Sequence, residues 1–178
     1  MALLYPKKKM ISELEILRSV DEENRITQRE LARRTGLSLG SVNVLIKRLI
    51  HKGLIKIEHV NSRTIKYILT PKGLMEKARL TYQYIIHSYN YISNIEYKLE
   101  QIVKCKNDSE KLILYGNKDE LYDIISAKLR SMNEKFEYFE RNTDISQFYE
   151  KEQIIITWQP EDFENELIIG IKIVNILK

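Results

Sequence analysis

The chain has 178 residues, of which 43% are hydrophobic and 30% charged, with a formal net charge of +4 at pH 7. This length allows one medium domain or two small ones, and the composition is ordinary for a soluble globular protein. No apolar run approaches the roughly 20 residues that span a bilayer. The short apolar start followed by Lys7 to Lys9 excludes a signal peptide. A single cysteine, Cys105, excludes an intramolecular disulfide and fits a reducing cytoplasm, and the three histidines form no metal-ligand pattern with it.

The charge is divided unevenly along the chain. Residues 1–80 contain 17 Lys and Arg against 8 Asp and Glu, a net charge of +9, whereas residues 81–178 contain 12 against 17, a net charge of −5. A basic region of this kind is the electrostatic footprint of a nucleic-acid-binding domain. The sequence therefore places DNA binding in the first part and another task in the second. Lys7 to Lys9 are either a flexible arm that touches phosphates or a solvated tail.

Two capping boxes mark the starts of the first two predicted helices, because each places Ser or Thr three residues before Glu. The first box, Ser12 to Glu15, opens a helix that is expected to bury Ile11, Leu14, Leu17 and Val20. The second box, Thr27 to Glu30, opens a helix from Gln28 to Arg34. Gly36 then permits a tight turn, since glycine adopts positive φ without steric cost.

The turn leads into a predicted recognition helix over residues 38–52, which completes a helix-turn-helix motif. Ser38 is a suitable N-cap, and Gly53 suits the left-handed position that often ends helices. The face expected to pack on the core carries Val42, Leu45, Ile46 and Leu49. The opposite face carries Gly40, Ser41, Asn43, Val44, Lys47 and Arg48. Small and polar residues followed by cations suit base edges and then phosphates, although an ordinary amphipathic helix with a solvated basic face has the same pattern.

A β-hairpin is predicted directly after this helix. Residues 54–69 contain two segments of alternating apolar and polar side chains, with a polar turn that includes Arg63. Such a hairpin is the wing of a winged helix, and Arg63 at its tip is placed to reach DNA. The complete set of predicted DNA contacts is Thr27, Gln28, Ser38, Gly40, Ser41, Asn43, Val44, Lys47, Arg48 and Arg63.

The run from Ile26 to Leu80 resembles the winged-helix domain of MarR-type transcription regulators. The matching segments are Ile26 to Ala32, Gly36 to Ser38, Lys52 to Ile55 and Leu69 to Gly73. Two further segments, Ser38 to Asn43 and Lys77 to Thr81, are similar to a narrower branch, the regulators associated with exopolysaccharide loci. The resemblance implies a sequence-specific regulator that binds double-stranded DNA, with the recognition helix in the major groove and the wing on flanking DNA.

A long helix is predicted to follow the wing, with Thr70 as its cap and Pro71 at its first position. The helical pattern persists to about Lys104, which at 1.5 Å per residue is roughly 50 Å. Its apolar seam, spaced four and three residues apart and interrupted once by glutamate, is Ala78, Tyr82, Ile85, Tyr89, Ile92, Glu96, Leu99 and Val103. Spacing of this kind is typical of coiled coils. The sequence predicts a homodimer through residues 78–103; the alternative is a helix packed along its own C-terminal domain.

The remaining residues alternate between predicted strands and helices. The predicted strands cover residues 112–116, 136–140, 154–158 and 170–177. The predicted helices cover residues 119–132, 144–150 and 161–168. This alternation predicts a small α/β domain of Rossmann type with a parallel sheet in the order 3-2-1-4. The predicted organisation is a winged helix over residues 1–70, a connecting helix over 71–105 and the α/β domain over 111–178.

The first of these strands ends in a weak candidate for a cofactor site. Gly116 ends that strand, and Glu140 follows 24 positions later, near the spacing of a ribose-binding acid. The two further glycines of the dinucleotide motif are absent, and Asp119 and Glu120 place negative charge where an anion would bind. No cofactor is therefore predicted, and no arrangement of nucleophile, base and acid indicates an enzyme. A nucleotide- or sugar-nucleotide-sensing protein with a DNA-binding module remains one alternative, and a dimeric scaffold whose winged helix binds protein is another.

Overall fold

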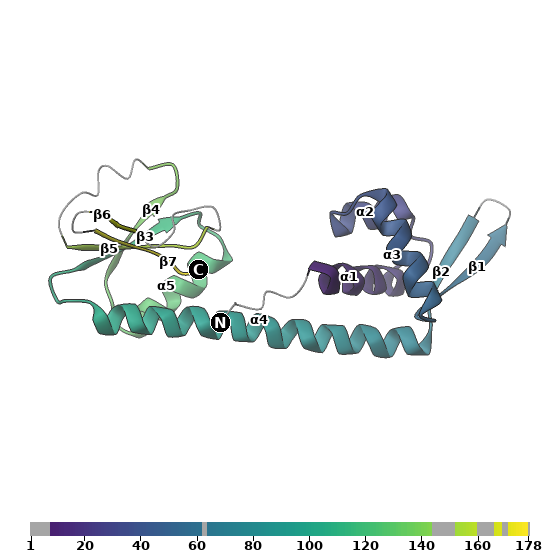
Figure 1. Ribbon diagram of the computed structural model, residues 1–178, viewed down its shortest axis with the longest axis horizontal. Helices are drawn as coiled ribbons and strands as arrows, with labels where there is room; N and C mark the ends of the chain where they lie inside the picture. The colour runs from purple at the N-terminus through teal and green to yellow at the C-terminus, as the bar shows by residue number, and fades with distance from the viewer. Residues whose placement is uncertain (1–7, 62–63, 144–151, 160–165, 169–170, 178) are drawn as a thin grey trace. The chain divides into compact units, whose positions relative to one another are not determined.

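The structure is a computed structural model and describes residues 8–61, 64–143, 152–159, 166–168 and 171–177. The chain divides into two compact units, Met1–Asn90 and Tyr91–Lys178, which we call unit 1 and unit 2. The division falls within one long helix, α4 (Pro71–Cys105), which is labelled in Figure 1. Among the described residues, no helix combines the length and hydropathy needed to cross a membrane.

Unit 1 is a winged helix, as predicted. Its elements before α4 are α1 (Lys8–Glu22), α2 (Gln28–Thr35), α3 (Leu39–His51), β1 (Ile55–Asn61) and β2 (Thr64–Leu69). The two strands form an antiparallel hairpin that follows α3. One core joins α1, α2, α3, the base of the hairpin and Leu80 of α4. The side chains of α3 predicted for this core, Val42, Leu45, Ile46 and Leu49, are all buried.

The first helix begins earlier than predicted. It already includes Lys8, so Ser12 lies inside the helix, where its hydroxyl donates to the Lys8 carbonyl at 2.9 Å. Ser12 is therefore not the N-cap that the sequence predicts, because it lies inside the helix and its hydroxyl bonds to a carbonyl of the preceding turn. Leu17 and Val20 are buried as expected, but Ile11 is 38% exposed.

Half of the capping box at the second helix forms. The Thr27 hydroxyl accepts from the Glu30 backbone N–H at 3.1 Å. The Glu30 carboxylate instead accepts from Arg33 and Arg34, whose hydrogen bonds lower the pKa of Glu30 to about 2. At the end of this helix Gly36 has φ of +64°, which is the left-handed turn that the sequence predicts.

Unit 2 contains a five-stranded sheet. Its elements after α4 are β3 (Lys111–Gly116), α5 (Glu120–Ser131), β4 (Phe136–Glu140), β5 (Gln153–Thr157), β6 (Glu166–Ile168) and β7 (Ile171–Asn175). The strand order is β4-β3-β5-β7-β6; the first four strands are parallel, and β6 is antiparallel to β7. The parallel sheet is thus confirmed, and β6 is an additional strand.

The predicted strand order, 3-2-1-4, is wrong. In the same numbering the four parallel strands have the order 2-1-3-4, because β5 pairs with β3 rather than with β4. Side-chain polarity accounts for the difference. All five residues of β5 are buried, as in a central strand, whereas Glu137 and Glu140 of β4 are exposed, as at a sheet edge.

The prediction of a helix over residues 161–168 is also wrong at its C-terminal end, because Glu166–Ile168 forms the strand β6, which pairs with β7. The helix predicted over residues 144–150 lies outside the described residues.

The second part of α4 packs within unit 2. Ile95, Leu99 and Ile102 are buried against α5 and one face of the sheet. The predicted seam over residues 78–103 is therefore used in two ways. Leu99 and the partly buried Val103 contribute to the core of unit 2, as the alternative of a helix packed along its own domain requires. In unit 1, Tyr82, Ile85 and Tyr89 are exposed.

Candidate nucleic-acid interface

The N-terminal end of α3 is fixed by two serines. The Ser38 hydroxyl accepts from the Ser41 backbone N–H at 3.2 Å and lies 2.9 Å from the Ser41 hydroxyl. This cap satisfies one of the free N–H groups of the first turn, as predicted. Gly40 and Ser41 are exposed beside it, and Val44 on the next turn is 67% exposed. The first turn of α3 therefore exposes the small residues Gly40 and Ser41, and small side chains allow another molecule to approach the helix closely.

A groove of about 660 Å³ runs between this surface and the start of α1. It brings together five of the predicted DNA contacts, Ser38, Gly40, Ser41, Val44 and Arg48, all from α3 or its cap. From α1 it is lined by Lys8, Lys9 and Ser12. Both lysines are exposed, so two accessible cations line the groove.

Among the predicted contacts with polar side chains, Asn43 and Lys47 have no partner in the residues that the structure describes. Asn43 is half-buried at the edge of the exposed face, and its amide has no hydrogen-bond partner in the part of the chain that the structure describes. Lys47 is exposed, and no described acidic side chain lies within ion-pair distance. An amide and an ammonium in this state are available to a ligand.

Thr27 and Gln28 lie at the start of α2. Thr27 is exposed and is occupied as the N-cap of the helix. The Gln28 amide donates to the Tyr67 hydroxyl of β2 at 3.0 Å, and the Tyr67 N–H donates to the Asn24 carbonyl at 3.1 Å. These bonds fasten the wing to the helix-turn-helix. The assignment of Gln28 to DNA thus stays a prediction for a residue that already has a partner, and Arg63 lies outside the described residues.

Arg48 has an acidic partner that the sequence reasoning missed. Its Nη2 donates to Glu13 Oε1 of α1 at 2.7 Å, and Lys52 Nζ lies 3.7 Å from the other oxygen of the same carboxylate. The Glu13 side chain is 8% exposed and that of Arg48 is 38% exposed. In the sequence Glu13 lies within an apparent capping box, and nothing there indicates that it pairs with Arg48 and Lys52.

Other cations of the surface were also missed. His51 is exposed on the last turn of α3, four residues after Lys47 and therefore on the same side of the helix. The spacing of four residues from Lys47 was the sequence signal from which His51 could have been predicted as part of this surface. Lys8 and Lys9, which the sequence assigns to a flexible arm or a solvated tail, both belong to α1.

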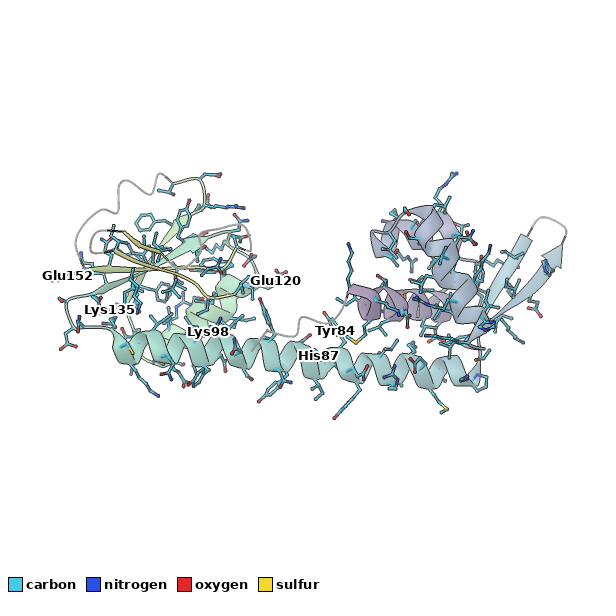
Figure 2. The ribbon with its side chains drawn as sticks, in the orientation of Figure 1. Tyr84, His87, Lys98, Glu120, Lys135 and Glu152 are labelled. Atoms are coloured by element: carbon cyan, nitrogen blue, oxygen red, sulfur yellow. The ribbon has the colours of Figure 1, made fainter. Side chains whose placement is uncertain are left out.

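A second accessible surface lies on α4 within unit 1. Its side chains Met75, Ala78, Tyr82, Ile85 and Tyr89 are exposed and are spaced three and four residues apart. We call this set the exposed seam. Tyr84 and His87, labelled in Figure 2, belong to the same stretch of helix. A groove of about 830 Å³ lies beside the seam and is also lined by Ile11, Leu14 and Arg18 of α1.

At the end of β3, where Gly116 is the weak candidate for a cofactor site, other side chains of the protein occupy the space beside the strand. A Cβ on Gly116 would lie 2.8 Å from the indole of Trp158, so the strand needs glycine here because the indole lies against its backbone. Trp158 Nε1 donates to the Asp119 carboxylate at 3.0 Å, and the same carboxylate caps α5 through two backbone N–H groups. Glu140 is exposed at the end of β4. The edge where a pyrophosphate would meet a helix end thus holds an indole and a carboxylate.

Residues 11–56 match a protein-family model described as "Winged helix-turn-helix DNA-binding". The match covers α1 from Ile11 onward, all of α2 and α3, and the first two residues of β1. No curated protein matches the sequence.

Three solved structures are similar in part. A MarR family protein of Mycobacterium tuberculosis in complex with p-aminosalicylic acid is 16% identical, covers 52% of this chain and 75% of its own, and has a TM-score of 0.43. The PcaV transcriptional regulator of Streptomyces coelicolor is 18% identical over 68% of this chain and 78% of its own, with a TM-score of 0.45. The YusO protein of Bacillus subtilis is 24% identical over 52% and 68%, with a TM-score of 0.39. These values describe a partial likeness of fold and carry no information on function.

Proposed function

We propose that this protein is a dimeric transcription regulator of the MarR type that binds double-stranded DNA in a sequence-specific manner. In this proposal α3 enters the major groove, the first turn of α2 and the wing lie against the backbone, and unit 2 takes no part in DNA contact. The assignment to the MarR type follows from the motif resemblance in unit 1.

The observation that carries the proposal is the exposed face of α3. It begins with a capped turn in which Gly40 and Ser41 are exposed beside Leu39, and it continues with Val44 and with the Asn43 amide, which has no partner among the described residues. It ends with Lys47 and His51. A helix lying in a major groove needs small and hydrogen-bonding groups near base edges and cations near phosphates. The family match over residues 11–56 supports the same assignment.

The dimer is proposed on the exposed seam of α4. Tyr82 is 66%, Ile85 57% and Tyr89 67% exposed, although large apolar side chains are rarely left so open in a row. Spacing of three and four residues places them in one stripe that an identical helix can cover. A symmetric dimer would also present two copies of α3 to two half-sites.

The decisive experiment is selection of bound sequences from random duplex DNA, followed by titration of the selected and a random duplex at several salt concentrations. We expect one enriched sequence with twofold symmetry and an affinity that falls steeply with salt. Absence of enrichment together with absence of salt-dependent binding would contradict the proposal.

Lys47 is expected to contact a phosphate. The substitution Lys47→Gln should weaken selected and random duplexes alike and flatten the slope of log affinity against log salt by about 0.9. The measurement is fluorescence anisotropy across a salt series. Lys104→Gln, which removes an exposed lysine from unit 2, is the matched control and should leave the slope unchanged.

Asn43 is expected to read a base. Its amide offers a donor and an acceptor that can pair with adenine N6 and N7. Asn43→Ala should therefore lose about 1–3 kcal/mol on the selected duplex and relax the preference at one position, while random DNA binds almost as before. Equal losses on both duplexes would instead identify Asn43 as a residue that only positions the helix. Asn90→Ala, an exposed asparagine of α4, is the control.

A further inference from the structure

The carboxylate of Glu13 connects the scaffold to the recognition helix. Glu13 belongs to α1, whereas Arg48 and Lys52 lie one turn apart at the end of α3. Its two oxygens lie 2.7 Å from Arg48 Nη2 and 3.7 Å from Lys52 Nζ, and the side chain is 8% exposed. A carboxylate removed from water is costly unless cations compensate it. One buried acid therefore faces two cations of the helix proposed to bind DNA.

Arg48 stands between two competing partners. It lines the groove together with Ser41 and Val44, so it borders the surface proposed to meet DNA. Its side chain is 38% exposed, which leaves a route to a phosphate. The bond to Glu13 is short and lies largely out of water, where salt screens charges much less than at an exposed site. A phosphate would have to replace this carboxylate.

We propose that Glu13 is a positioning residue that withholds Arg48 from DNA phosphates and thereby weakens sequence-independent binding. This inference rests on the proposed DNA-binding function. Contacts between cations and phosphates supply nearly all of non-specific affinity, so the number of cations free to reach DNA sets its strength. Glu13 removes Arg48 from the cations that are free to reach DNA. Its second carboxylate oxygen, 3.7 Å from Lys52 Nζ, also attracts Lys52 away from DNA.

The test compares Glu13→Gln with Glu15→Gln on a random duplex. Both substitutions remove one negative charge from α1, but Glu15 lines the groove beside α4 rather than the one beside α3. Glu13→Gln should steepen the slope of log affinity against log salt by about 0.9, so that affinity falls about threefold more between 50 and 200 mM salt. Glu15→Gln should leave the slope as in the wild type. Equal slopes for the two variants would overturn the inference.

Substitution of Arg48 provides the second measurement, and its comparison with Lys47→Gln in the otherwise unchanged chain does not depend on the folding of the Glu13 variant. With Glu13 present, Arg48→Gln should flatten the slope by less than a third of the change caused by Lys47→Gln. In the Glu13→Gln background the same substitution should flatten it by about 0.9. Equal effects of Arg48→Gln and Lys47→Gln in the otherwise unchanged chain would overturn the inference. A wild-type protein that binds no duplex at low salt would overturn the proposed function itself.

Discussion

Replacing Ile85 and Tyr89 together with glutamate should convert the protein from dimers to monomers and lower its affinity for the selected duplex about a hundredfold. Both side chains belong to the exposed seam, and two carboxylates facing their symmetry mates would have to be buried without compensation. The loss of affinity follows because two linked half-site contacts bind 10²–10⁴ times more tightly than one. Sedimentation velocity at micromolar concentration measures the association state, and anisotropy measures the affinity.

The matched control is the double substitution Gln83→Glu with Asn90→Glu. These positions lie seven residues apart on the same helix, outside the three-and-four spacing of the seam, and neither lines the groove beside it. The control should remain dimeric and should lose affinity only through its added negative charge. A wild-type protein that sediments as a monomer, or a seam variant that remains dimeric, would contradict the dimer proposed on the seam.

The winged helix was predictable because local signals in unit 1 agree with one another. Ser38 is both the best cap and the actual cap of α3, Gly36 is placed where φ is positive, and the apolar side chains of α3 repeat at helical spacing. Each signal depends on neighbours within a few residues. A fold can be predicted from the sequence when its local signals agree with one another in this way.

Features set by distant residues were not predictable in the same way. Glu13 and Arg48 are 35 positions apart, and nothing near either residue indicates the ion pair. The same holds for Trp158, which lies against Gly116 from 42 positions further along the chain. The strand order could have been improved, because Glu137 and Glu140 mark β4 as an edge strand while β5 has three isoleucines in succession.

The role of α4 combines both cases. Its extent from Pro71 to Cys105 was predictable, since a capped start is followed by a long stretch without proline or glycine after Gly73. Periodicity alone could not separate its two faces. A seam residue buried by its own unit, such as Leu99, and a seam residue left open, such as Ile85, have the same spacing. Only the tertiary structure assigns each of them.

Trp158 is the residue of unit 2 whose loss should cost most. Its ring is 1% exposed, lies against Gly116, and has its centroid 6.2 Å from that of Tyr122. Its N–H also supplies one of the bonds to the Asp119 carboxylate that caps α5. Removing the side chain would therefore open a cavity and loosen the cap of a helix at the same time.

Trp158→Ala should lower the free energy of unfolding of unit 2 by about 3–5 kcal/mol, the usual cost of deleting a buried aromatic ring. Because each unit has its own core, calorimetry should show one transition moved to lower temperature and the transition of unit 1 unchanged. Trp158→Phe is the control; it retains most of the apolar volume, loses the bond to Asp119, and should cost about 1–2 kcal/mol. An equal shift of both transitions would mean that the units unfold together and that the loss cannot be assigned to this contact.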